Sequence, residues 1–340
     1  MNILILGGTR FFGYHIARRL VEDGHAVTLF NRGQTGDDLG DRVQRIRGDR
    51  YDYNRFYGQL RGKTFDAVVD MLAFKAEDSQ AAVRTFEGHV GHFIHISTGS
   101  VYVVTKDFPC PLREEDFNRE LCPPPKRDAE MWLYGYHKRK CEEVLREAFQ
   151  GMTFPVMILR LPIVIGERDH TLRAYSYFLR LGDGSPVILP DGGMNVFTHI
   201  YQGDIVKTVA ANLMNRASFG QAYNLAMDEV MSLRRFVLKS AEILGKKPVL
   251  VDVPWQVLEE SGLGTSFSPF STRRPFVLST EKAKRNLNYS STPVETWLEK
   301  TIFWFAEVYQ GGTPENYRER EKEVAFVHKF REAVRSLKSD

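Results

Sequence analysis

The chain has 340 residues, of which 43% are hydrophobic and 26% charged, and its 46 basic side chains nearly balance 43 acidic ones. This composition is typical of a soluble globular protein, and a net charge of +3 gives no reason to expect a nucleic-acid or membrane surface. No apolar stretch reaches the roughly 20 residues of a membrane span, and no basic leader precedes a cleavage site, so we expect a cytoplasmic protein. The length exceeds what a single core usually fills, which predicts two domains.

The chain contains three cysteines, Cys110, Cys122 and Cys141. Their spacing matches no metal site, and we expect no bound metal. Their small, odd number fits a reducing compartment better than a disulfide framework.

The first elements form a strand, a glycine-rich turn, a helix and a second strand. An apolar run over 3–6 stops at Gly7, a helical pattern covers 12–23, and another apolar run covers 26–30. In such a unit the helix N-terminus binds the pyrophosphate of a dinucleotide. The glycines fall at 7, 8 and 13, while Arg10 takes the place of a middle glycine and offers a guanidinium to the phosphates. The alternative is a tight turn that serves packing alone.

Strands and helices continue to alternate through the first half. We expect strands over 43–48, 65–72, 92–98 and 156–161, and helices over 76–87 and 134–149. This order predicts an α/β fold with a doubly wound parallel sheet. The proline-rich stretch 106–127 is expected to be a long surface loop.

After Gly166 the pattern changes. We expect helices over 172–181 and 204–215, strands over 187–189, 196–200 and 222–225, a helix capped by Ser232 and ending at Gly245, and a helix starting at Thr292-Pro293. The domains are predicted as 1–165, to which segments near 196–226 return, a smaller mixed α/β substrate domain over 166–312, and a charged helical tail over 313–340. The tail is either a solvated helix or a partner-binding segment.

Three side chains are candidates for catalysis. Tyr134 and Lys138 are spaced i, i+4 and share a helix face, so the lysine ammonium favours the phenolate form of the tyrosine. Such a phenol can exchange a proton with a sugar or alcohol oxygen, and Thr98 at a strand end can hold that oxygen. The alternatives are a chance spacing, since Tyr136 and Lys140 repeat it, and a Thr98 hydroxyl that bonds only the local backbone.

Two features concern the adenosine end of the dinucleotide. The second strand is followed by Asn31 and Arg32 with no carboxylate for a ribose. Arg32 can pair with a 2′-phosphate, which favours NADP slightly over NAD, unless it is only an exposed turn residue. Asp49 either accepts from the adenine amino group or caps a helix.

These motifs together resemble the extended short-chain dehydrogenase/reductase superfamily, in its nucleotide-sugar epimerase/dehydratase group. The resemblance covers about residues 1–309 and depends on Gly7–Gly13, Gly48-Asp49, Ser97-Thr98 with Tyr102, Tyr134 with Lys138 and Glu142, Leu159 to Gly166, Phe197 to Ile200 and Tyr223 to Leu225. The turn Gly-Gly-Thr-Arg-Phe-Phe-Gly looks closest to the atypical branch that includes chloroplast stem-loop-binding proteins, as do 268–270 and 279–284.

The resemblance implies a Rossmann domain that binds NAD(P)(H), a smaller substrate domain and a homodimer. It implies that Tyr134 and Lys138 hold the nicotinamide side of the cofactor and that Thr98 binds the reacting hydroxyl. The cofactor contacts we expect are Gly7, Thr9, Arg10, Phe11, Phe12, Gly13, Asn31, Arg32, Asp49, Arg50, Leu72, Ala73, Phe74, Ser97, Tyr134, Lys138 and Pro162.

The substrate end departs from the nucleotide-sugar pattern. Ile163 stands where these enzymes usually have Asn, and Asn195 where many have Arg. Arg273 and Arg274 offer either a diphosphate grip or a surface pair. The expected substrate contacts are Thr98, Ser100, Asn195, Arg273 and Arg274.

Three functions remain open at this point. Epimerisation of a nucleotide sugar by transient oxidation is the first, because Gly99 and Ser100 follow Thr98 where 4,6-dehydratases carry a carboxylate pair. Reduction of a keto-sugar or other carbonyl by NADPH is the second. The third is an RNA-binding protein that reuses the fold, which the balanced charge disfavours.

Overall fold

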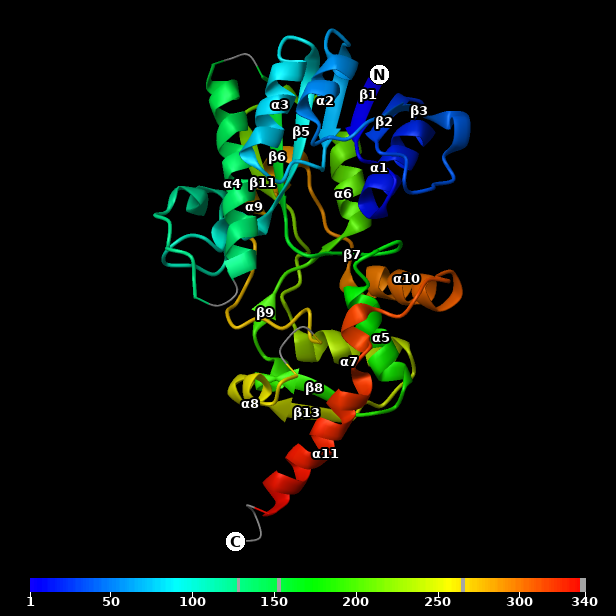
Figure 1. Ribbon diagram of the computed structural model, residues 1–340, viewed down its shortest axis with the longest axis vertical. Coiled ribbons are helices and arrows are strands. Elements are labelled where there is room, and N and C mark those ends of the chain that lie inside the picture. Colours follow the sequence, from blue (N-terminus) through cyan, green and yellow to red (C-terminus); the bar gives the residue numbers. More distant parts are fainter. Residues whose placement is uncertain (127–128, 152–153, 264–266, 337–340) are drawn as a thin grey trace. The chain divides into compact units, whose positions relative to one another are not determined.

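The computed structural model describes residues 1–126, 129–151, 154–263 and 267–336, and the chain forms two compact units (Figure 1). Unit 1 comprises Met1–Val164, His199–Asp228 and Leu278–Thr292. Unit 2 comprises Ile165–Thr198, Glu229–Val277 and Pro293–Asp340.

Unit 1 is built on a seven-stranded parallel sheet in the order β11-β6-β5-β4-β1-β2-β3. The strands are β1 (Asn2–Leu6), β2 (Ala26–Asn31), β3 (Gln44–Arg47), β4 (Phe65–Asp70), β5 (Val90–Thr98), β6 (Val156–Leu161) and β11 (Gln221–Asn224). The helices are α1 (Phe11–Glu22), α2 (Tyr53–Leu60), α3 (Ala76–Phe86), α4 (Ala129–Gln150), α6 (Gln202–Ala211) and α9 (Glu281–Leu287). The strand order confirms the predicted doubly wound sheet of a Rossmann-like fold.

Alternate residues of β1 show how the two faces are covered. Ile3 and Ile5 are buried in a cluster with side chains from α1 and α6, whereas Leu4 and Leu6 are buried with side chains from α2, α3 and α4. Because both faces are covered, the central strands are mainly hydrophobic, which is why they were visible in the sequence.

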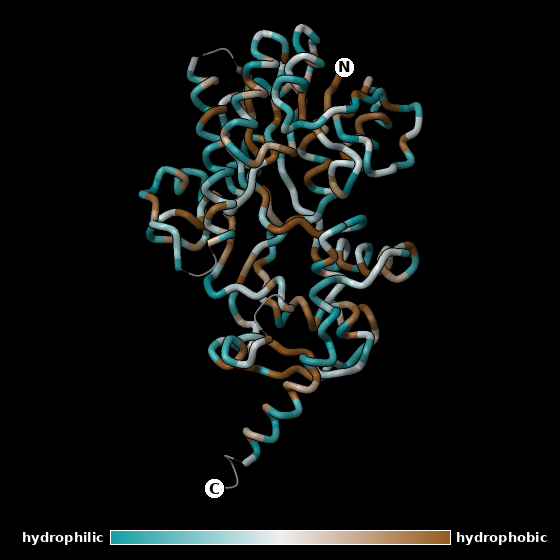
Figure 2. The backbone as a smooth tube through the Cα atoms, in the orientation of Figure 1, coloured by the Kyte–Doolittle hydropathy of each residue, from teal (hydrophilic) through white to brown (hydrophobic). Residues whose placement is uncertain are grey.

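Unit 2 contains two small sheets and five helices among its described residues. β8 (Val187–Pro190) pairs in parallel with β13 (Leu250–Val253), and both are hydrophobic in Figure 2, while β9 (Val196–Phe197) pairs with β12 (Met231–Ser232). The helices are α5 (Arg173–Gly182), α7 (Leu233–Ile243), α8 (Trp255–Glu260), α10 (Val294–Glu307) and α11 (Arg320–Ser336). Ser232 caps α7 as expected, since its hydroxyl accepts from the Arg235 N–H at 3.2 Å.

Three expectations need correction. The predicted strand over 196–200 is two short strands, β9 in unit 2 and β10 (Ile200–Tyr201) in unit 1. The chain first passes from unit 1 to unit 2 within another short strand, β7 (Val164–Ile165). The segment Leu278–Thr292 belongs to unit 1 and not to the substrate domain: the Ser279 N–H donates to Leu112 O at 2.8 Å, and the Tyr289 hydroxyl to Ala226 O at 2.7 Å.

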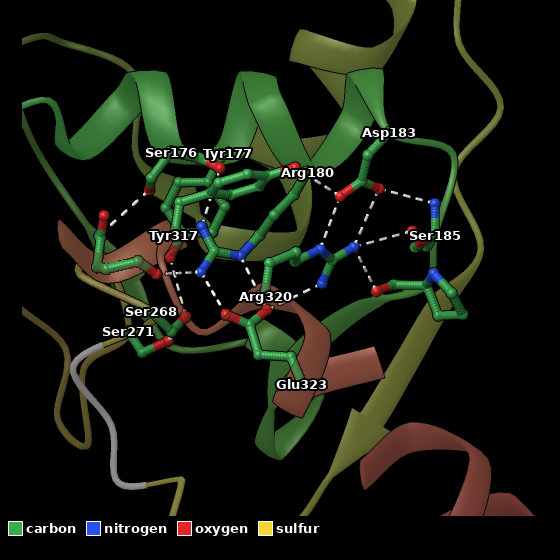
Figure 3. Close-up of polar contacts among 12 residues, drawn as sticks. Ser176, Tyr177, Arg180, Asp183, Ser185, Ser268, Ser271, Tyr317, Arg320 and Glu323 are labelled. Carbon is green, nitrogen blue, oxygen red and sulfur yellow. Dashed lines mark hydrogen bonds and ion pairs between the residues drawn. The ribbon is translucent and has the colours of Figure 1, made fainter. Parts of the chain in front are cut away.

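The third correction concerns the charged tail, whose helix α11 is anchored in unit 2 (Figure 3). Glu323 is buried and accepts from Arg180 of α5, with Nε to Oε2 at 3.0 Å, and Arg320 pairs with Asp183 at 2.8 Å. Val327 is fully buried in an apolar cluster with β8 and β13. The first half of α11 is therefore neither a solvated helix nor a free segment; residues 337–340 lie outside the described residues.

Candidate active site

The carboxyl ends of the first five strands lie at one edge of the parallel sheet, as their common direction requires. Most of the predicted cofactor residues follow these ends directly, so the fold gathers them there. They are Gly7–Gly13 after β1, 31–32 at the end of β2, 49–50 after β3, 72–74 after β4 and 97–98 at the end of β5.

The turn between β1 and α1 requires its glycines. Gly7 and Gly8 have φ angles of +109° and +85°, and a Cβ on Gly8 would lie 2.7 Å from a Leu29 methyl group. A Cβ on Gly13 would lie 2.6 Å from the Met71 sulfur, so its absence lets α1 start close against the end of β4. The sequence predicts a pyrophosphate at this helix start.

The N-terminus of α1 favours an anion. The N-cap residue Arg10 provides no side-chain cap, and its Nε donates instead to Thr35 Oγ1 at 2.9 Å, in the loop after β2. The first turn of α1 carries no acidic side chain to oppose a phosphate. Thr9 and Phe12 are half-buried beside it, whereas the Phe11 side chain is buried and contributes packing.

The segments at the expected adenosine end are ordered by local hydrogen bonds. Asn31 links β2 to the glycine turn, because its Nδ2 donates to Gly7 O at 3.2 Å and its Oδ1 accepts from the Gly33 N–H at 2.9 Å. Arg32 is exposed beside it. Asp49 accepts from the Tyr51 N–H at 2.9 Å and so stabilises its own turn.

Arg50 differs from its neighbours because its guanidinium is buried in unit 1. Its Nη2 donates to Asp70 Oδ2 at 2.9 Å and to Asp78 O at 2.7 Å. Asp78 in turn accepts from the Phe74 N–H at 2.7 Å. Arg50 therefore supports the loop of Leu72, Ala73 and Phe74 from beneath.

Lys138 reaches the sheet from α4 and is almost fully buried, with 2% of its surface exposed. Its Nζ donates to Ala73 O at 2.7 Å and to Ile96 O at 2.8 Å, and it lies 3.4 Å from His95 Nε2. Burial lowers the pKa of the Lys138 ammonium. The structure thus brings Lys138 between β4 and β5, next to the loop predicted for the cofactor.

Tyr134 lies near Lys138 and is more exposed, at 38%. Its ring centroid is 6.4 Å from that of Phe74, and the same Phe74 ring lies 5.6 Å from the Lys138 Nζ. The two predicted catalytic side chains therefore share one aromatic neighbour.

The repeated spacing on α4 has a different environment. Tyr136 stacks on Trp132 with ring centroids 5.1 Å apart, and Lys140 donates to Glu143 Oε2 at 2.6 Å. Lys140 also lies 5.4 Å from the centre of the Tyr136 ring. This second pair takes part in packing along the helix, which distinguishes it from Tyr134 and Lys138.

Thr98 begins the short turn after β5. Its Oγ1 accepts from the Ser100 N–H at 3.1 Å and donates to the Ser100 hydroxyl at 3.2 Å, so the local backbone bond considered for it does form. A Cβ on Gly135 would lie 2.2 Å from Ser100 O, so this glycine lets α4 pass close to the turn. Thr98 and Ser100 thus lie against the helix that carries Tyr134.

Ser97 has a structural partner. Its hydroxyl donates to Glu142 Oε1 at 2.6 Å, and Glu142 pairs with Arg160 at 2.6 Å in the core of unit 1. Burial acts to raise the pKa of Glu142, but the ion pair with Arg160 outweighs it and the pKa is lowered. The Ser97 hydroxyl is therefore used in the core of unit 1, and only the backbone of Ser97 is left for the predicted cofactor contact.

Sequence reasoning missed His95 and Asp70. Both interrupt apolar runs, His95 between Ile94 and Ile96 and Asp70 after Val69, and both are completely buried. A polar side chain on a strand covered on both faces is the signal that was available.

The predicted substrate residues divide between the units. Thr98 and Ser100 belong to unit 1, whereas Asn195, Arg273 and Arg274 belong to unit 2. Pro162, which is predicted as a cofactor contact, is half-buried after β6 in unit 1. Asn195 Nδ2 donates to Thr272 O at 2.7 Å and thereby fixes the loop before the two arginines. Arg273 and Arg274 are both exposed, and Arg273 pairs with Glu259 and lies over Trp255.

Two further observations concern the described residues. Within the described ranges, no group of three or more His, Cys, Asp and Glu side chains is arranged to hold a metal ion. Across these same residues, no helix combines the length and the apolar character needed to cross a membrane.

Known proteins resemble the chain in sequence. It is 26% identical to the chloroplast stem-loop binding protein of 41 kDa b of Arabidopsis thaliana over 302 residues, which is 85% of this chain and 74% of that protein. It is 24% identical to the 2′-dehydrokanamycin reductase of Streptomyces kanamyceticus over 261 residues, 75% of this chain and 70% of the reductase.

Solved structures share the fold at lower identity. The UDP-glucuronic acid 4-epimerase of Bacillus cereus in complex with NAD has a TM-score of 0.70 at 20% identity, covering 92% of this chain and 99% of the epimerase. The dTDP-glucose 4,6-dehydratase of Bacillus anthracis in complex with NAD has a TM-score of 0.72 at 15% identity, covering 91% and 98%. The family model described as the NAD dependent epimerase/dehydratase family matches residues 3–226, and the chain belongs to this family.

Proposed function

We propose that this protein is an NAD(P)-dependent enzyme that interconverts a hydroxyl and a ketone on a sugar, with a nucleotide sugar as its substrate class. The observation that carries the proposal is the buried Lys138 ammonium at the sheet edge, which shares the Phe74 ring with Tyr134. A lysine is rarely buried without a reason, because removing its charge from water is costly.

The chain's own residues fit the cofactor that the family uses. The glycine turn of Gly7, Gly8 and Gly13 and the start of α1 would hold the pyrophosphate, and Asn31, Arg32 and Asp49 stand near the expected adenosine end. When bound, the nicotinamide supplies the two-electron oxidation and reduction that no amino-acid side chain provides.

The remaining chemistry is proton transfer. Tyr134 takes a proton from the sugar hydroxyl or returns it, and the positive charge of Lys138 favours the phenolate that does so. The Thr98 hydroxyl holds the same sugar oxygen by a hydrogen bond. The sequence predicts Arg273 and Arg274 as contacts for a diphosphate, and Arg273 also pairs with Glu259 within unit 2.

Epimerisation by transient oxidation is the reaction we favour. It needs the proton relay, a retained cofactor and room for the sugar to turn over, and no further side chain. Gly99 and Ser100 after Thr98 supply no carboxylate for the elimination step of a dehydratase. The fold is shared with both an epimerase and a 4,6-dehydratase, so it supports the substrate class and leaves the choice of reaction to the residues after Thr98.

Net reduction of a keto-sugar is the second candidate. It is favoured by the similarity to a 2′-dehydrokanamycin reductase and by Arg32, an exposed cation directly after β2 that can pair with the 2′-phosphate of NADP. RNA binding is favoured only by the relative named for stem-loop binding, and it gives the buried Lys138 no role.

A homodimer completes the proposal. Met131 and Leu133 on α4 are 55% and 45% exposed in the single chain, so an interface on this helix would have apolar surface to bury. Light scattering after size exclusion tests this directly, since a monomer would contradict it.

The decisive experiment releases and identifies the nucleotide of the purified protein by mass spectrometry, then follows both reactions. An epimerase retains nucleotide and interconverts a sugar pair without net consumption of NADH or NADPH. A reductase consumes NADPH in proportion to the ketone reduced. No bound or exchangeable nucleotide, together with salt-sensitive RNA retention in a gel shift, would overturn the proposal in favour of RNA binding.

A further inference from the structure

We infer that His95 is a positioning residue for Lys138: its neutral imidazole is the third hydrogen-bond acceptor of the buried ammonium and holds it, charged, beside Tyr134. The inference rests on the proposed function, in which Lys138 acts on Tyr134 through its charge.

The geometry of the ammonium carries the first step. A lysine ammonium has three donors and no lone pair, and three acceptors surround it: Ala73 O at 2.7 Å, Ile96 O at 2.8 Å and His95 Nε2 at 3.4 Å. With 2% of Lys138 exposed, water cannot replace a missing acceptor at low cost. Two of the three acceptors are backbone carbonyls that any sequence supplies, so His95 is the partner that depends on residue choice.

The charge of His95 gives the second step. Burial is the largest cause that lowers its pKa well below the ordinary value, and the neighbouring cations Lys138 and Arg50 act in the same direction. The imidazole is therefore neutral, with a hydrogen on one nitrogen and a lone pair on the other. Since an ammonium faces only a lone pair, Nε2 accepts and Nδ1 carries the hydrogen.

The other nitrogen of His95 supports the same assignment. Nδ1 is buried, and among the described residues it has no hydrogen-bond partner. A buried donor without a partner is costly, and a leucine or phenylalanine would avoid that cost on this apolar strand. The contact with Lys138 is the benefit that offsets it.

The charged groups around Lys138 are otherwise committed. At longer range, groups on three elements raise the Lys138 pKa against burial, namely Asp70 of β4, Asp78 of α3, and Cys141 and Glu142 of α4. Asp70 pairs with Arg50, Glu142 pairs with Arg160, and the Asp78 carboxylate accepts from the Tyr53 hydroxyl and the Phe74 N–H. Burial raises the pKa of Cys141 to about 11, so it stays an uncharged thiol. The imidazole thus supplies an acceptor where no free carboxylate stands.

The test measures the titration of the Tyr134 phenol without cofactor or substrate. Ultraviolet difference spectra between each protein and its Tyr134→Phe counterpart isolate this phenol from the others. In His95→Leu, which removes the acceptor, we expect the midpoint to move to higher pH by about one unit, because the ammonium is less well held beside the phenol. His95→Gln keeps an acceptor and should stay within about 0.3 unit of wild type.

Two controls separate the possible failures. Lys138→Met should move the midpoint at least as far as His95→Leu, and adding His95→Leu to it should move it no further. His92→Leu removes another buried histidine of β5, one that bonds Leu213 O, and should leave the midpoint unchanged. If His95→Leu does not fold, His95→Phe fills the space without supplying an acceptor, and the Tyr134 midpoint is measured in that variant instead.

The outcomes are distinguishable. If Lys138→Met shifts the Tyr134 midpoint and neither acceptor-free variant of His95 does, the role of His95 is wrong while the proposed function stands. If Lys138→Met itself has no effect, the proton relay of the proposed function fails. An equal shift in His95→Gln and His95→Leu would also overturn the inference, because packing and not the acceptor would then explain it.

Discussion

Lys138 of unit 1 and Arg180 of unit 2 are both cations with only 2% of their surface exposed, yet their partners differ in kind. Arg180 meets the Glu323 carboxylate through two nitrogens, with Nε to Oε2 at 3.0 Å and Nη2 to Oε1 at 2.5 Å (Figure 3). Lys138 meets three neutral acceptors.

The difference bears on what each charge can do. The carboxylate of an ion pair nearly cancels the electric field of its cation at a distance, so the role of Arg180 is to hold α11 on α5. A cation held by neutral acceptors keeps its field and can act on a neighbouring phenol. Buried charge therefore indicates a chemical role in unit 1 and a structural role in unit 2, and the variants below test that distinction.

The largest expected effect is on catalysis in unit 1. Tyr134→Phe should lower turnover of the sugar substrate by about 10²–10⁴-fold, because the proton relay is removed, while nucleotide binding changes little. Initial rates and a titration with NADH measure the two quantities. Tyr136→Phe is the matched control on the same helix, and an equal loss in that variant would move the catalytic role to the second pair.

In unit 2 the corresponding change should affect stability. Glu323→Ala leaves Arg180 and Arg320 without their shared carboxylate and should lower the free energy of unfolding by about 3–5 kcal/mol. Urea denaturation followed by tryptophan fluorescence measures it. Glu319→Ala removes an exposed pair with Lys322 and should cost less than about 1 kcal/mol. Equal losses would show that α11 is not anchored by the buried pair.

The sequence predicted the elements whose signal is local. β6 was predicted over its full extent because its apolar run, which only Arg160 interrupts, marks a strand covered on both faces. α2 was missed because its eight residues bury only Phe56 and Leu60, too few for a visible period. α4 begins at Ala129, five residues before the predicted start, since Met131 and Leu133 gave no apolar face.

The site was predictable in its residue types and not in its long-range contacts. Spacing could not separate Tyr134 and Lys138 from the repeated pair, because both pairs have the same period. The burial and the contacts of the two lysines distinguish them. His95 lies 43 residues from Lys138, and Arg180 lies 143 from Glu323. Such pairings depend on the folded path of the chain and leave no local pattern to read.

A smaller effect concerns the free energy of unfolding at acid pH, which should depend on His92 of unit 1. Burial lowers the pKa of His92 to about 4, so between pH 6.5 and 4 the unfolded chain binds a proton that the folded chain does not. Stability therefore falls as the pH falls through this window, by about 3 kcal/mol for this one group.

His92→Asn keeps a donor for Leu213 O and removes this titration, so its unfolding free energy should depend less on pH than that of wild type. In unit 2, burial acts to raise the pKa of Asp183, but its hydrogen bonds, above all the one from Arg320, outweigh burial and the pKa is lowered. The contribution of Asp183 to the free energy of unfolding is therefore lost only as the pH falls through this lowered pKa. Parallel pH profiles for His92→Asn and wild type between pH 7 and 4 would contradict the assignment.

The smallest effect concerns cofactor choice at the exposed end of β2. Arg32→Ala should weaken NADPH by about tenfold, the loss of one charge-assisted contact of roughly 1.4 kcal/mol, and should leave NADH nearly unchanged, because only NADPH carries the 2′-phosphate. Fluorescence titration of both cofactors measures the ratio. Arg18→Ala is the control, since Arg18 is another exposed arginine, which pairs with Glu22 along α1.

Raising the salt concentration should reduce the wild-type preference for NADPH toward that of Arg32→Ala, because an exposed charge pair is screened. If Arg32→Ala weakened both cofactors alike, the residue would serve the turn after β2 and the preference for NADP would have no basis in this strand.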